Sequence, residues 1–220
     1  WTPRTAEPGE PGSALVEEPH LSNDAQADAA CGTFALDQWY VAAYSSELDA
    51  ARPLARKLCG EPVVLFRDPN GMPHALLDRC WHRLLPLSLG ELDSGRIRCM
   101  YHGLEFDGNG HCVRIPGVER IPATARVRRF PLLEQAGLVW IWLAAQPPDQ
   151  ERPPDLPWLG RPDFAVCRSQ RRVACDFRLL IDNLMDASHL AFVHRDTLAD
   201  PALLDVVPEV AAVGGTVSVK

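Results

Sequence analysis

Two short motifs, each pairing a cysteine with a histidine, constrain this 220-residue chain more than any other feature. They are Cys80-Trp81-His82 and Cys99-Met100-Tyr101-His102, and sixteen residues lie between them. Two thiolates and two imidazoles can hold a 2Fe-2S cluster in which sulfur binds one iron and nitrogen binds the other. The neutral imidazoles raise the reduction potential above that of an all-thiolate cluster. The motifs therefore predict an electron carrier.

Zinc is the nearest alternative for the same four side chains. A Cys2His2 zinc site usually has two cysteines in one short segment and two histidines in another, whereas each segment here supplies one of each. The mixed pairs favour a cluster of the Rieske type, bound by Cys80, His82, Cys99 and His102. Neither loop contains an additional cysteine that could form a disulfide between them, which favours a lower potential suited to feeding an oxygenase.

The surrounding sequence predicts hairpins that carry the two ligand loops. Apolar runs at 62–66, 74–77, 97–101 and 104–106 are typical of short strands. Asp68-Pro69-Asn70-Gly71 and Asp107-Gly108-Asn109-Gly110 are tight-turn sequences. The segment Ile115-Pro116-Gly117 could screen the cluster from water, and an ordinary surface turn is the alternative.

A second set of polar residues occupies the segment 182–194. On a helix, Asp182, Asp186 and His189 share one face, whereas His194 is turned about 140° from His189. Two imidazoles and a carboxylate can bind non-haem Fe(II) and leave positions open for oxygen and substrate. If both histidines bind one iron, the helix has to deform or end between them. Histidines that cap a helix or bond within a core are the alternative.

Together these motifs resemble the Rieske non-haem iron oxygenases, and three segments resemble their vanillate O-demethylase branch. The segments are Trp39-Tyr40-Val41-Ala42-Ala43, His82-Arg83 with Pro86-Leu87-Ser88, and Asp182-Asn183-Leu184-Met185-Asp186. The resemblance spans about residues 37–200. It implies a fold of class α+β, with an all-β Rieske domain followed by the start of an α+β catalytic domain that has an antiparallel sheet.

The resemblance also implies how electrons move. A reductase or ferredoxin would pass electrons from NAD(P)H to the cluster of one subunit of a homotrimer, and Asp186 would bridge His102 to His189 of the neighbouring subunit. His189 and His194 would hold mononuclear Fe(II), which uses O2 to demethylate or hydroxylate a small aromatic substrate. A carboxylate that accepts hydrogen bonds from two ligand imidazoles fixes their orientation. A structural role for Asp186 is the alternative.

The family's third iron ligand, an aspartate, lies far beyond the position of Lys220, which predicts that the sequence is partial. The composition predicts four regions: a disordered leader at 1–34, the Rieske domain at 35–146, a proline-rich linker at 147–163, and the first part of the catalytic domain at 164–220. Strands are expected at 172–175 and 211–219, and Asp176 is a helix N-cap candidate.

The composition indicates in which compartment the protein is located and which classes of partner it binds. Five cysteines remain outside the cluster motifs, and dispersed thiols suit a reducing compartment, so we expect a cytoplasmic protein. A net charge of −7 argues against nucleic-acid binding, and the apolar run 138–143 is too short to cross a membrane. The basic segment 126–129 could receive an acidic electron donor, and a solvated strand face is the alternative. A Rieske electron-transfer protein without catalytic iron is the competing functional hypothesis.

Overall fold

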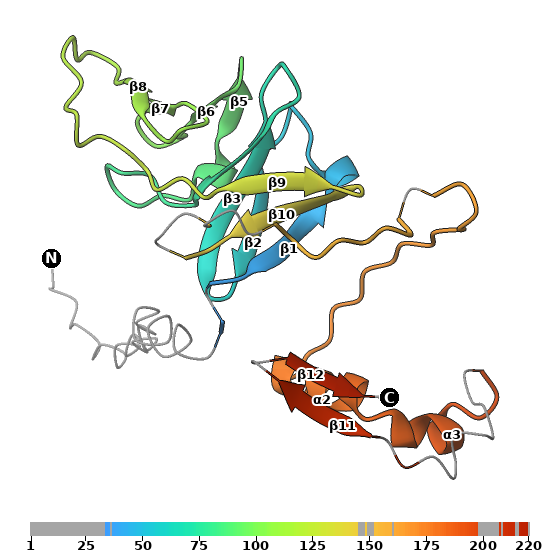
Figure 1. The fold of residues 1–220 in the computed structure, drawn as a ribbon. Helices are drawn as coiled ribbons and strands as arrows, with labels where there is room; N and C mark the ends of the chain where they lie inside the picture. Colours follow the sequence, from blue (N-terminus) through green and yellow to red (C-terminus); the bar gives the residue numbers. More distant parts are fainter. Residues whose placement is uncertain are drawn as a thin grey trace, which may run out of the picture. The chain divides into compact units, whose positions relative to one another are not determined.

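A computed structural model describes residues 34, 35, 37–144, 148, 152–159, 161–197, 207, 209–213 and 216–219. These residues form two compact units, and the boundary between the units falls in the sequence between Ala165 and Val166. The first unit contains only β-strands and short 3-10 helices among its described elements, and the second contains helices and one hairpin (Figure 1). The expected α+β class is confirmed. Most of the predicted leader lies outside the described residues.

Three antiparallel sheets make up the first unit (Figure 1). The first sheet has the order β1-β10-β9, with β1 at Trp39–Tyr44, β10 at Leu138–Trp142 and β9 at Leu132–Gln135. The second has the order β2-β3-β4, at Leu54–Leu58, Glu61–Arg67 and Pro73–Leu77. The third has the order β5-β6-β7-β8, at Glu91–Asp93, Arg96–Arg98, Glu105–Phe106 and Cys112–Arg114. The 3-10 helices are η1 at Ser45–Glu47 and η2 at Leu87–Leu89.

Strand β3 lies between two hydrophobic cores because successive side chains of a strand point to opposite faces. Val63 and Leu65 pack with residues of the β1-β10-β9 sheet, including Val139 and Ile141. The other face of β3 packs in what we call the ligand-loop core, which consists of Val64, Phe66, Leu76, Cys80, Leu87, Ile97, Cys99, Leu104, Phe106, Cys112, Ala125 and Val127. Both motif cysteines therefore belong to one buried core, which the β-sheets position.

The two predicted tight turns have the same hydrogen-bond pattern. In the first, Oδ1 of Asp68 accepts from the backbone N–H of Asn70 and of Met72, both at 2.9 Å. In the second, Oδ1 of Asp107 accepts from the N–H groups two and four residues later, also at 2.9 Å. Aspartate favours such turns because its side chain can bond the backbone two residues on. Both turn predictions are confirmed.

Gly108 in the second turn packs against the ring of His74 on β4. A Cβ atom built at Gly108 would lie 2.3 Å from His74 Nδ1, and the ring is held by a 3.3 Å contact between its Nε2 atom and Asp68 Oδ2. We expect Gly108→Ala to lower the free energy of unfolding by about 1–3 kcal/mol, as overpacking does. Urea denaturation of G108A, H74A and the double variant measures this. The penalty of G108A should largely disappear in the H74A background, and equal penalties in both backgrounds would contradict the contact.

The second unit contains helix α2 at Phe177–Met185, a 3-10 turn η3 at Ala187–His189, helix α3 at Leu190–Val193, and the hairpin β11-β12 at Val210–Val213 and Thr216–Val219 (Figure 1). Asp176 caps α2 as predicted, because its side chain accepts a hydrogen bond from Arg178 N–H. No helix in the described part of the chain has the length and apolar character needed to cross a bilayer.

Three strand predictions need correction. The strand expected at 97–101 ends at Arg98, because the next residue, Cys99, starts the hydrogen-bonded ligand loop. Residues 172–175 form no strand in the described structure. The single strand expected at 211–219 is a hairpin in which Val213 pairs with Thr216. The intervening Gly214-Gly215 is a preferred hairpin-turn sequence that the prediction overlooked.

Candidate metal centres

The first predicted ligand loop is closed by two backbone hydrogen bonds. Cys80 N–H donates to the carbonyl of Leu85 at 2.8 Å, and Leu84 N–H donates to the carbonyl of Cys80 at 2.9 Å. Leu84 has a φ of 59°, in the left-handed region that non-glycine residues seldom adopt. The loop therefore has a fixed shape, with the thiol of Cys80 at its base.

The second loop repeats this pattern. Cys99 N–H donates to the carbonyl of Leu104 at 2.8 Å, and Gly103 N–H donates to the carbonyl of Cys99 at 3.0 Å. Gly103 has a φ of 71° and occupies the position that Leu84 has in the first loop. A Cβ atom at Gly103 would lie 3.0 Å from Cγ of Pro116. The segment 115–117 forms an exposed turn, closed by a 3.1 Å hydrogen bond from Val118 N–H to the carbonyl of Ile115, and Pro116 packs against the second ligand loop. The role of this segment as a screen for the cluster stays a prediction.

The two motif histidines face each other across the loops. Their Nδ1 atoms are 3.2 Å apart, and their ring centroids are 4.6 Å apart at an interplanar angle of 63°. Two imidazole nitrogens, each about 2.1 Å from one metal ion, lie about 3.0–3.4 Å apart when the angle at the metal is about 90–110°. The separation of His82 and His102 therefore fits ligation of one iron through both Nδ1 atoms, and it leaves each Nε2–H to donate to another group.

The two motif cysteines are buried beneath the exposed histidines. Cys80 is 1% exposed and Cys99 is 2% exposed. Burial, together with a hydrogen bond to Cys99, raises the pKa of the Cys80 thiol to about 11. A thiol in this position keeps its proton unless a positive charge lies beside it, and a bound iron supplies such a charge. Two buried sulfurs and two exposed nitrogens fit a cluster in which cysteines bind one iron and histidines bind the other.

Large apolar side chains surround the two histidines at the surface. Trp81, Leu84, Met100 and Tyr101 are between 40% and 63% exposed, and we call them the apolar collar. The ring of Tyr101 stacks on His102, with the centroids 3.9 Å apart. Exposed apolar groups clustered around a functional group are typical of a surface that another protein covers.

In the second unit, the chain bends so that His189 and His194 come together. Helix α2 ends at Met185, earlier than predicted, and the chain continues through η3 and the short helix α3. The two imidazole rings are then 5.4 Å apart between centroids, at an interplanar angle of 64°. Nδ1 of His189 donates to the carbonyl of Asp186 at 2.5 Å, which leaves Nε2 of His189 available to a metal.

Asp186 lies where α2 ends and η3 begins. Its Oδ1 atom accepts from Ser188 N–H at 2.9 Å and from the Ser188 hydroxyl. These hydrogen bonds hold the pKa of Asp186 below its usual value, so its carboxylate is ionised at neutral pH. Within the described residues, the other oxygen, Oδ2, accepts no hydrogen bond. Asp186 thus has a carboxylate oxygen available to an additional donor.

No third ligand joins the histidine pair in the described structure. Among the described residues, no group of three or more His, Cys, Asp or Glu side chains is arranged to hold a single metal ion. Two of the four carboxylates that follow His194 within the sequence, Asp200 and Asp205, lie outside the described residues. The two imidazoles fit part of a facial iron site, and the third ligand stays a prediction.

Two buried acidic residues beside the ligand loops were missed in the sequence. Asp78 and Glu105 are the buried charged side chains of the described residues. Asp78 lies two residues before Cys80, and Glu105 directly follows Leu104 at the end of the second loop. The sequence signal was an acidic residue at the end of each apolar strand leading to or from a cysteine motif.

The arginine side chains of the basic segment 126–129 contact other residues of the same chain. Arg128 donates to the carbonyl of Leu143 at 2.7 Å, and Arg129 donates to Oδ1 of Asn109 at 2.6 Å. Arg126 lies 3.4 Å from Nε2 of His111. These contacts favour the strand-face alternative over a docking site for an acidic donor.

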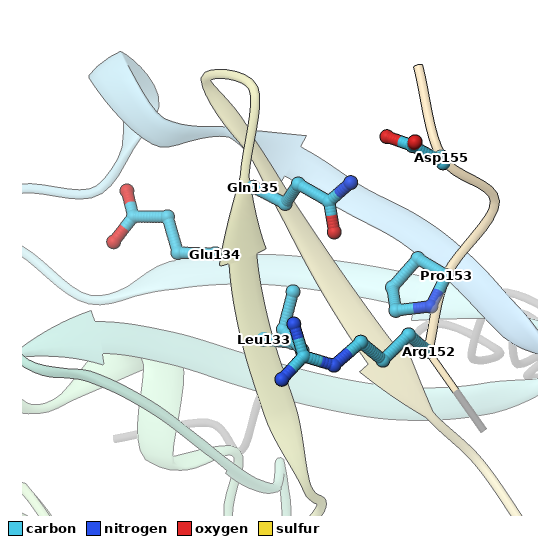
Figure 2. Close-up of a pocket in the computed structure, with 6 residues that line it drawn as sticks. All are labelled: Leu133, Glu134, Gln135, Arg152, Pro153 and Asp155. Atoms are coloured by element: carbon cyan, nitrogen blue, oxygen red, sulfur yellow. The ribbon is translucent and has the colours of Figure 1, made fainter. Parts of the chain in front are cut away.

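A hollow of about 560 Å³ lies in the first unit. Its lining residues are Leu133, Glu134, Gln135, Arg152, Pro153 and Asp155 (Figure 2). Figure 2 shows Glu134 turned away from the Arg152–Asp155 segment, and its carboxylate pairs with Arg67 at 2.6 Å. The hollow includes no candidate metal ligand and is not part of either centre.

Two protein families match this chain in the regions that carry the two candidate centres. The Rieske [2Fe-2S] domain matches residues 38–131, and the vanillate O-demethylase oxygenase C-terminal domain matches residues 173–220. The putative toluene-4-sulfonate monooxygenase system iron-sulfur subunit of Comamonas testosteroni is 43% identical over 173 residues, which are 77% of this chain and 49% of that protein. The dicamba O-demethylase oxygenase component of Stenotrophomonas maltophilia is 44% identical over 167 residues, 74% of this chain and 48% of that protein.

The fold also matches a solved structure. The crystal structure of dicamba monooxygenase bound to dicamba has a TM-score of 0.74 and 40% identity, over 84% of this chain and 55% of that chain. The chain spans about half the length of the curated relatives it matches. With a Rieske domain followed by a vanillate O-demethylase-type domain, this chain belongs to the family of Rieske non-haem iron oxygenase α subunits.

Proposed function

We propose that this chain is the electron-accepting and iron-binding part of an oxygenase component that uses O2 to demethylate or hydroxylate an aromatic substrate. The observation that carries the proposal is the presence of two separate ligand sets in one chain. One set fits a Rieske cluster, and the other brings His189 and His194 to 5.4 Å between ring centroids. A protein that only carries electrons has no use for the second set.

In this proposal, Cys80 and Cys99 hold the buried iron of the cluster and His82 and His102 hold the exposed one. His189 and His194 hold a mononuclear Fe(II), which supplies oxygen activation when it is bound. The Asp186 carbonyl orients His189 by accepting from its Nδ1–H group. The third iron ligand is expected beyond Lys220.

A homotrimer would bring the two centres of different subunits together. The apolar collar supports this, because it surrounds the imidazoles through which electrons would leave and it is exposed within one chain. Asp186 would then join the two centres, because its carboxylate would accept a hydrogen bond from His102 of one subunit while its backbone carbonyl accepts from His189 Nδ1–H within its own subunit. The available Oδ2 atom of Asp186 suits that role.

The donor is proposed to be a reductase or ferredoxin that draws on NAD(P)H. The relatives named as a toluene-4-sulfonate monooxygenase subunit and a dicamba O-demethylase component support a small aromatic substrate and either monooxygenation or O-demethylation, and N-demethylation is a further form of the same proposed reaction. The described cysteines are all free, which suits the reducing cytoplasm as the location.

Metal and oxygen analysis tests the proposal. The protein is purified anaerobically, together with any sequence that continues its reading frame beyond Lys220, and is assayed for iron, zinc and acid-labile sulfide. We expect three irons per chain, two of them with sulfide, and oxygen consumption when a reductant and an aromatic acid are supplied. Two irons per chain without oxygen consumption would indicate a Rieske electron carrier, and zinc without sulfide would refute both functions.

A further inference from the structure

Each ligand loop adjoins a buried carboxylate, and the two carboxylates differ in how their charge is balanced. Asp78 is 7% exposed and Glu105 is 5% exposed. Removing a carboxylate from water is costly unless it is paired or hydrogen-bonded. The partners of each one therefore show what charge it presents to the metal centre beside it.

Glu105 is balanced by arginines. Its Oε1 atom accepts from Arg114 Nη1 at 2.9 Å and from Arg98 Nε at 3.1 Å. Burial alone would raise the pKa of Glu105, but these hydrogen bonds hold it below its usual value. The two guanidinium groups therefore balance the negative charge of the Glu105 carboxylate at the second loop.

Asp78 has neutral donors instead. Its Oδ1 atom accepts from Ser88 N–H at 2.7 Å, and its Oδ2 atom accepts from the Ser88 hydroxyl at 2.6 Å. In the described part of the chain, Asp78 forms no ion pair with a cationic side chain. Both oxygens act as acceptors, as in an ionised carboxylate, so a buried negative charge stays uncompensated at the first loop.

The same hydrogen bonds close the base of the first loop. Asp78 precedes Cys80, and Ser88 belongs to η2, three residues after Leu85 ends the loop. Asp78 N–H also donates to the carbonyl of Pro62 on β3 at 2.9 Å. Both ends of the loop are thus tied to each other and to β3, and the orientation of the thiol of Cys80 depends on these bonds.

We propose that Asp78 is a positioning residue of the cluster, that it fixes the first ligand loop through Ser88, and that its uncompensated charge lowers the reduction potential. Two residues of chain span at most about 7 Å, so the carboxylate lies near Cys80. A negative charge at that range disfavours the added electron. This inference rests on the cluster of the proposed function, and it involves neither the mononuclear iron nor substrate.

The test compares Asp78→Asn, Ser88→Ala and Ser88→Thr in the full chain after anaerobic cluster loading. Iron and sulfide content, the electron paramagnetic resonance spectrum of the reduced cluster, and a redox titration are measured for each. A unit charge about 10 Å away at an effective dielectric constant of about 20 changes a one-electron equilibrium by about tenfold. We therefore expect D78N to raise the potential by about 59 mV, which is a tenfold change for one electron.

Ser88→Ala keeps the charge but removes one hydrogen bond. We expect an altered resonance spectrum and a potential that is equal to or below that of the unmodified protein, and S88T should restore the original spectrum because it keeps the hydroxyl. Asp49→Asn removes an exposed carboxylate beside Leu48 of the other hydrophobic core and is the charge control, with no expected shift.

Two outcomes would overturn the proposal. One is D78N with a full cluster and an unshifted potential. The other is D78N without a cluster while S88A has an unchanged spectrum, since Asp78 would then serve folding alone. Neither outcome bears on oxygen consumption by the unmodified protein, so the proposed function is tested separately.

Discussion

His189→Ala is expected to remove the mononuclear iron and reduce oxygen-dependent turnover by more than about 100-fold, while the Rieske cluster stays intact. Loss of a group that only orients a metal ligand already costs about 10–100-fold, so loss of a ligand itself should cost more. The cluster should be spared because its four candidate ligands lie in the first unit, whereas His189 lies in the second. Iron content, the cluster spectrum and oxygen uptake measure the three expectations.

His111→Ala is the matched control for H189A. His111 is also exposed and lies beside a carboxylate, with its Nδ1 atom 3.6 Å from Asp107 Oδ2, but it belongs to neither ligand set. We expect H111A to keep all three irons and its turnover. If H189A kept its third iron and its turnover, the assignment of the second centre would be wrong, and the chain would be better described as an electron carrier.

The sequence predicted the first centre well because its ligands are local. Each cysteine and its histidine lie within four residues, and the strands on either side follow from apolar runs and Asp-x-Asn-Gly turns. The shape of the loops was not predictable in the same way. Leu84 takes a positive φ that its residue type disfavours, and its role became visible only beside Gly103 in the second loop.

The second centre was predicted less completely. Helical periodicity predicted a break between the two histidines, but α2 ends earlier, at Met185, and helix α3 occupies the residues between His189 and His194. At this break the side chain of Asp186 accepts a hydrogen bond from the backbone N–H of Ser188, which competes with the helix and is not part of the apolar pattern. The buried pair of Asp78 and Ser88 was missed for a similar reason, since the two polar groups are ten positions apart in the sequence and meet only after the loop has formed.

The second large effect is expected from Asp186→Asn. If Asp186 joins two imidazoles across a subunit interface, the variant should bind the cluster and the mononuclear iron normally but lose turnover by about 100-fold or more. An asparagine keeps one oxygen that can accept from Ser188 N–H, so the turn that carries His189 is preserved. Its amide NH2 group cannot accept a hydrogen bond, so it cannot replace the second carboxylate oxygen.

Asp186→Ala is a less specific test than Asp186→Asn because it removes two interactions. Alanine removes the bridge and also the cap on η3, and loss of such a cap costs about 1 kcal/mol of stability. We therefore expect D186A to lose turnover equally while unfolding at a lower urea concentration than D186N. Asp182→Asn, one helical turn earlier on α2, is the control and should keep its turnover.

Rapid reduction of the cluster followed by slow reoxidation in D186N would place the defect between the two centres, because the donor still delivers electrons and only their onward passage depends on the carboxylate. Substantial turnover by D186N, with oxygen uptake still coupled to product, would reject the bridge and leave Asp186 as a cap for the histidine turn.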